Sequence, residues 1–394
     1  MKLTAVGSGY FRVFKDGVEV SKHTSEREAI EKAFQVESLE PSANVTYKHD
    51  YEVKVETDAI PAPAPAPPPI AETTGTTGII HLYSPTSYAN KLLTNEPVAV
   101  NSATLVSALW NDIVTYGGAG INVLDDSRPI YFVDENAPKK KIRITSQWAY
   151  NQQNALILNA GIPMPSTFVI SGGTDNHLCI VVTRNGVPIR EFDFWRMAPS
   201  TDPNFDYEAK ESGILDNVMV SDGTLDRRAD WNTATASHIP LCVGTGRINP
   251  ADKTVHWNQC VALAIKRPAP YPTFKFPAKS APDGVTGGII PYGQRFKFPA
   301  NIVIDPVWKP VTKKLVTAIR DRGMVIVDKS GSGATFYIED PRQYGMGAYV
   351  KPAWADWNIE DVLVPLYDGK MPYKIFGDKN NTPEFPWLKL EAIA

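Results

Sequence analysis

Residues 178 to 195 read LCIVVTRNGVPIREFDFW, and this stretch decides the fold of the larger part of the chain. Two runs rich in β-branched and aromatic residues flank Asn185-Gly186, a pair that favours a two-residue hairpin turn. We therefore predict antiparallel strands on either side of this turn. Cys260 to Lys266 is a continuous apolar run and predicts another, fully buried strand.

Further strands are predicted toward the C-terminus. Met324 to Asp328 and Ala334 to Ile338 are predicted to form a second hairpin across residues 329–333. Helices are predicted from a cap at Asn101 or Ser102 to Gly117-Gly118, over residues 146–160, and from Pro310 to Gly323. The pattern predicts an α+β chain, mostly β, with a large β-sandwich-like domain over residues 79–394 that carries a few helices.

The first 58 residues predict a separate β-β-α-β module. Strands are expected at 10–15 and 18–21 around Asp16-Gly17, and a long alternating strand at 45–55. Ser25 and Glu28 form a capping box at the start of the expected helix. Residues 59–78 are a Pro/Ala-rich linker, whose run from Pro61 to Pro69 favours an extended polyproline II spacer.

Composition limits the classes of function. The 394 residues carry a net charge of -3, which argues against a nucleic-acid partner. No apolar run is long enough to predict membrane insertion, and the start of the chain has no signal-peptide pattern, so we expect synthesis in a cytoplasm. The cysteines, Cys179, Cys242 and Cys260, lack metal-type spacing, and we expect no metal or cofactor. We interpret them as small buried apolar residues, with a Cys242–Cys260 disulfide as the alternative.

Asp175 and His177 are the first pair of candidate site residues. In a strand they would share a face, so that Asp175 could orient His177 as a general base or sugar ligand. Alternatively, Thr174-Asp175-Asn176 forms a turn and His177 is a structural residue.

Glu191 and Asp193 are the second pair. They share one strand face, as paired carboxyl groups in glycoside hydrolysis would require, and Trp195 and Arg196 follow. The alternative is a solvated charged face. Aromatic faces stack on sugars, although tryptophan is more often part of a core. The candidate ligand-binding residues are His177, Trp195, Arg196, Trp231 and His238.

Several short signatures between residues 117 and 341 occur in an order that resembles a poorly characterised family of bacterial and phage-borne β-rich proteins. They lie at residues 116–122, 173–178, 191–197, 231–236, 239–241, 290–296 and 322–328. The family pattern places an Asp-His pair before the Ala-Leu-Ala run, where this chain has Asn258 and Gln259. If that pair is an acid–base couple, the departure argues against catalysis.

The N-terminal module resembles small N-terminal modules of tailed-phage structural proteins, on residues 10–20, the capped helix and residues 49–55. The resemblance implies a bacteriophage virion structural protein, of fibre or decoration type, made in the host cytoplasm and docked to other virion proteins through residues 1–58. Its large domain would serve carbohydrate binding or host attachment, and phage fibres imply a homo-oligomer. Two alternatives stay open: a virion-associated polysaccharide hydrolase or lyase using Asp175, His177, Glu191 and Asp193, and a purely architectural capsid or neck protein.

Overall fold

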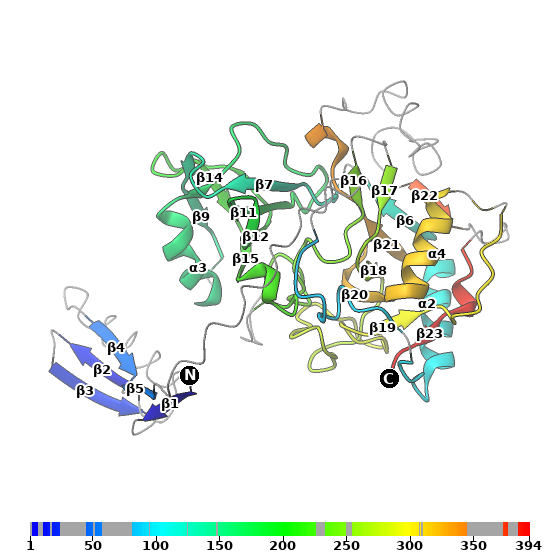
Figure 1. Ribbon diagram of the computed structural model, residues 1–394, viewed down its shortest axis with the longest axis horizontal. Helices are drawn as coiled ribbons and strands as arrows, with labels where there is room; N and C mark the ends of the chain where they lie inside the picture. The colour runs from blue at the N-terminus through cyan, green and yellow to red at the C-terminus, as the bar shows by residue number, and fades with distance from the viewer. Residues whose placement is uncertain are drawn as a thin grey trace. The chain divides into compact units, whose positions relative to one another are not determined.

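The computed structural model divides the chain into two compact units, Met1–Gly75 and Thr76–Ala394 (Figure 1). In the first unit the structure describes residues 2–6, 11–15, 18–23, 45–49 and 52–56. In the second it describes residues 81–394 except 94, 124, 147–148, 226–232, 250–253, 307, 309, 345–372 and 377–384. The predicted helix after Ser25 and the predicted linker fall outside the described residues.

The first unit contains the predicted hairpin. Strand β2 (Phe11–Lys15) pairs antiparallel with β3 (Val18–His23), and β4 (Val45–His49) pairs with the other edge of β2. The expected long strand over 45–55 is instead two strands in different sheets. Its second half, β5 (Glu52–Glu56), pairs with a strand that the sequence did not predict, β1 (Lys2–Val6).

A four-stranded sheet in the second unit is built on the quoted stretch. Its order is β15-β12-β11-β7, with bounds Glu211–Asp216, Val187–Trp195, Leu178–Arg184 and Ile130–Asp134. The β11–β12 hairpin is confirmed: Asn185 and Gly186 have φ of 51° and 79°, the left-handed pair of a type I′ turn. Strand β7 joins the other edge of β11 in parallel.

A seven-stranded mixed sheet forms the other half of the unit. Its order is β22-β6-β21-β18-β20-β19-β23, with bounds Tyr373–Phe376, Ala119–Asn122, Ala334–Tyr337, Val261–Ile265, Met324–Lys329, Arg295–Lys297 and Glu391–Ala392. The predicted β20–β21 hairpin is wrong, because β18 lies between the two strands, parallel to β20 and antiparallel to β21. The segment 330–333 therefore crosses the end of β18.

Short elements complete the second unit. The strands are β8 (Lys139–Lys140), β9 (Ile142–Ile144), β10 (Ile162–Pro163), β13 (Ala198–Pro199), β14 (Tyr207–Ala209), β16 (Arg247–Asn249) and β17 (Thr254–His256). The helices are α2 (Ser102–Thr115), α3 (Ala149–Asn159) and α4 (Pro310–Arg322), with short 3-10 turns at Val218–Val220, Pro341–Tyr344 and Trp387–Lys389.

The three helices lie where they were expected and Asn101 is the N-cap residue of α2, but a side-chain capping bond is absent. Neither Asn101 nor Ser102 provides it: Asn101 makes no side-chain capping bond, and the Ser102 hydroxyl accepts the backbone N–H of Ala392 at 2.7 Å. That bond ties the helix to the last strand. No helix among the described residues is long and apolar enough to cross a membrane.

Side-chain alternation along the strands produces four layers. In β18, Val261, Leu263 and Ile265 pack with α2 and α4, whereas Ala262 and Ala264 belong to a middle cluster. In β11, the even-numbered residues 178–182 pack with α3, while Cys179 and Val181 join the same middle cluster. The two sheets thus face each other across one apolar layer, with α3 outside one sheet and α2 and α4 outside the other (Figure 1). The predicted mostly-β α+β class is confirmed.

Candidate functional site

A cavity of about 490 Å³ is lined in part by residues of β6 and β21, and it is the candidate site. Four segments line it: residues 116–122, 125–126, 173–175 and 329–337. Carboxylate, amide, hydroxyl and ammonium groups all reach its wall, along with the rings of Tyr116 and Tyr337. Such a mixture of hydrogen-bonding groups with aromatic carbon suits a ligand rich in hydroxyl groups.

Asp126 organises one side of the cavity. Its Oδ1 accepts the backbone N–H groups of Thr174 and Asp175, each at 2.9 Å, and so holds the turn 173–175 against the connection between β6 and β7. Burial raises the pKa of Asp126, and the Asp175 carboxylate raises it further. The close approach requires glycine at position 173, where φ is 78° and a Cβ would lie 2.3 Å from Asp126 Oδ1.

Asp175 lies in the cavity wall, and Trp195 fixes its orientation. The indole Nε1 of Trp195 donates to Asp175 Oδ1 at 3.0 Å, while the backbone N–H of Arg196 donates to the Asp175 carbonyl at 2.7 Å. The guanidinium carbon of the exposed Arg196 lies 4.4 Å from the centre of the Trp195 ring. Trp195 therefore supports a cavity residue and is not itself part of the lining.

Segment 329–333 supplies another part of the wall. Backbone bonds anchor it: Ser330 N–H donates to the Ile265 carbonyl, and Lys266 N–H donates to the Gly333 carbonyl. The hydroxyl groups of Ser330, Ser332 and Thr335 form a cluster with separations of 2.8 to 3.2 Å. These hydroxyls can exchange hydrogen bonds with one another or with a ligand.

The aromatic part of the wall rests on a buried cation. The Arg128 guanidinium carbon lies 3.7 Å from the centre of the Tyr337 ring, and Arg128 is fully buried. One of its nitrogens, Nη1, donates to the Leu241 carbonyl at 3.1 Å. Tyr337 is itself only 3% exposed, so this contact fixes a mostly buried part of the wall.

His177 lies beneath the site. Its ring is 1% exposed, and burial lowers the pKa of His177 to about 4, with Arg128 adding to the effect of burial and Asp175 opposing it. Residues 173–175 form a turn and Asn176 has φ 44°, so Asp175 and His177 do not share a strand face. The alternative interpretation of a turn with a structural histidine is the one seen, because the ring is covered and neutral.

Glu191 and Asp193 share a face of β12 as predicted, but that face is the middle layer. Both are 0% exposed. The Glu191 side chain accepts the Tyr83 hydroxyl at 2.7 Å and the Cys242 backbone N–H at 3.2 Å, and Asp193 Oδ2 accepts the Leu241 N–H at 2.9 Å. Both the solvated charged face and a contact with polymeric substrate are therefore wrong for this pair: segment 239–243 and Tyr83 cover it.

The other described sequence candidates are not among the residues that line the cavity. His238 is 1% exposed, and Trp231 lies outside the described residues. The five described tryptophans, at positions 110, 195, 257, 308 and 387, are buried or partly buried, as expected for core residues. Two of the signatures quoted above, residues 116–122 and 173–178, converge on the cavity. That convergence is the signal by which Asn122 and the neighbouring Asp126 could have been found.

Comparison of the chain with family models, curated proteins and solved structures finds no match.

Proposed function

We propose that the chain is a tailed-phage virion structural protein, of fibre or decoration type, whose second unit binds a host glycan in the cavity between residues 116–126, 173–175 and 329–337. The cavity carries the proposal: it is large enough for a sugar residue or two, and it offers fixed carboxylate, amide and hydroxyl groups beside tyrosine rings. The virion assignment is supported by the N-terminal sequence pattern and the Pro/Ala-rich segment after it.

Fixed polar groups favour a glycan over an apolar ligand. The Asp126 carboxylate is held by two backbone bonds and the Asp175 carboxylate by the Trp195 indole. A ligand therefore meets acceptors that are already oriented, and the entropy lost on binding is smaller. Vicinal hydroxyl groups of a sugar can donate to such carboxylates while its apolar face contacts a tyrosine ring.

The test uses the full chain and a panel of purified bacterial surface polysaccharides. Wild-type protein is expected to bind at least one of them in calorimetry, and Gly331→Trp should weaken that binding at least tenfold. Gly331 lines the cavity, and a Cβ at this position would meet no atom within 4 Å, so the backbone has room for a side chain that occupies the cavity. Val187→Trp, on the exposed start of β12, is the matched control and should bind as wild type does.

Two results would overturn the glycan proposal. One is the absence of binding to every polysaccharide of the panel. The other is equal affinity of wild type and Gly331→Trp, which would place any binding elsewhere on the protein.

A hydrolase or lyase is a second candidate because the cavity places the Asp126 carboxyl group close to the Asp175 carboxylate. Burial and the neighbouring Asp175 raise the pKa of Asp126, a condition that favours a general acid. Under this candidate, wild type releases new reducing ends or unsaturated sugars, and Asp126→Asn binds the glycan but releases none. Binding without products supports the recognition role instead.

A further inference from the structure

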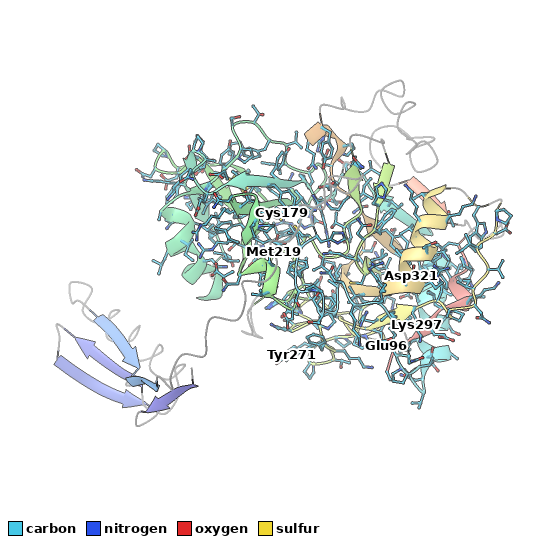
Figure 2. The ribbon with its side chains drawn as sticks, viewed as in Figure 1. Glu96, Cys179, Met219, Tyr271, Lys297 and Asp321 are labelled. Carbon is cyan, nitrogen blue, oxygen red and sulfur yellow. The ribbon has the colours of Figure 1, made fainter. Side chains whose placement is uncertain are left out.

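The middle layer between the two sheets holds a cluster that the cavity does not use. Cys179 Sγ lies 3.1 Å from Cys242 Sγ and 3.7 Å from Glu191 Oε1. One ligand atom from each of the three residues falls within 4.8 Å of the other two. The cysteines are free and 63 residues apart, so their spacing gave no sign of a shared site. Figure 2 shows Cys179 in the interior of the second unit.

Asp193 points to the same cluster independently. It lies directly opposite Cys179 in the β11–β12 ladder, and its side chain is fully buried. Its Oδ2 accepts the Leu241 N–H, but its Oδ1 has no hydrogen-bond partner among the described residues. An unpartnered carboxyl oxygen in an apolar layer is costly unless another group meets it.

The groups that contact these carboxyls carry no positive charge. The groups around Glu191 and Asp193 are a tyrosine hydroxyl, backbone N–H groups and the two thiols, and the two carboxyls also contact each other. In the part of the chain that the structure describes, neither carboxylate forms an ion pair with lysine or arginine. Two carboxyls and two thiols thus share a buried space that a cation would make favourable.

We infer that Cys179, Cys242, Glu191 and Asp193 bind one zinc ion between the two sheets. Zinc combines thiolate sulfur with carboxylate oxygen in four-coordinate sites, whereas magnesium and calcium prefer oxygen alone. Binding exchanges the protons held by the thiol and carboxyl ligands for the metal and releases them to solvent. Sulfur–zinc bonds of about 2.3 Å hold two sulfurs roughly 3.8 Å apart, so the thiols separate slightly on binding.

Tyr83 and the Cys242 backbone support the site. The Tyr83 hydroxyl occupies Glu191 Oε2, which leaves Oε1 directed at the sulfurs. Such outer contacts fix the orientation of metal ligands. Because all four ligands are at most 2% exposed, the site is closed. The ion joins the hairpin of the four-stranded sheet to segment 239–243, which makes it a structural metal.

The full chain, purified under reducing conditions and dialysed against zinc, tests this inference. We expect about one zinc per chain by elemental analysis. Replacement by Co²⁺ should give the sulfur-to-cobalt charge-transfer absorption and the intense visible bands of a tetrahedral thiolate site. Cys179→Ser should lose both signals, and Cys260→Ser should keep them. Cys260 is the matched control, since it is equally buried but outside the cluster.

If Cys179→Ser fails to fold, the unfolding temperature of the wild-type protein alone still tests the inference. Excess Zn²⁺ should raise the unfolding temperature of the metal-stripped chain, whereas the same concentration of Mg²⁺ should not. The inference is overturned if wild type binds neither zinc nor cobalt, if Cys260→Ser abolishes binding, or if mass spectrometry finds Cys179 and Cys242 joined as a disulfide in the fresh reduced protein. Each of these results leaves the glycan proposal untouched, because the cavity shares no residue with the cluster.

Discussion

At the scale of single residues, Asp328 near the end of β20 makes the free energy of unfolding depend on pH. Burial raises the pKa of Asp328 to about 8, and the Asp283 and Asp175 carboxylates add to the shift. An aspartate in an unfolded chain ionises near pH 4. Between those values the folded protein keeps a proton that the unfolded chain has lost, so the free energy of unfolding falls as pH rises through the window.

Asp328→Asn removes the titrating carboxyl group. The amide oxygen of the asparagine can still accept the Lys329 N–H, as Asp328 Oδ1 does at 2.9 Å. We expect the variant to gain stability relative to wild type from pH 4 to 8, by at most about 1.4 kcal/mol per pH unit. Urea denaturation at pH 5 and pH 7.5 measures the difference. Parallel losses of stability in the two proteins would contradict a proton held at Asp328.

Residue patterns predicted which face of a strand a side chain lies on, but they did not predict whether that face is buried. Glu191 and Asp193 lie on one face of β12, as a period of two requires. What covers that face is Tyr83 and segment 239–243, each about 50 or more residues away in sequence. No local pattern carries that information, so the sequence could not distinguish a solvated carboxylate pair from a buried one.

At the scale of elements, central strand β18 determines the middle of the seven-stranded sheet. All five of its residues are 0% exposed, and it pairs with a strand on each side. Leu263→Ala removes buried carbon facing α2 and α4 and should cost about 2–5 kcal/mol of unfolding free energy. Val303→Ala, at a side chain 75% exposed, is the control and should change stability by less than about 0.5 kcal/mol. Denaturant midpoints would decide, and equal costs at the two positions would contradict the central place of β18.

The same strand explains where element prediction failed. The β11–β12 hairpin was predictable because Asn185-Gly186 joins neighbours in both sequence and space. Residues 330–333 carry equally good turn residues, yet their flanking strands are separated by β18, which comes from about 60 residues earlier. Turn residues indicate that the chain reverses direction. They do not indicate whether the two flanking strands pair directly or have a third strand between them. The cavity wall depends on this insertion, so the site could not be derived from local pattern alone.

At the scale of the whole molecule, the described apolar clusters lie within the second unit, between Leu82 and Ala392. A unit with its own core is expected to fold alone. A chain of residues 76–394 should therefore unfold at a temperature within a few degrees of the matching transition in the full chain, and it should bind the same glycan. If the first unit docks to the particle, the shortened chain is also absent from purified virions, whereas the full chain is present. Calorimetry on the two chains gives the first comparison, and a transition lowered by more than about 5 °C would show that residues 1–75 contribute to the stability of the second unit.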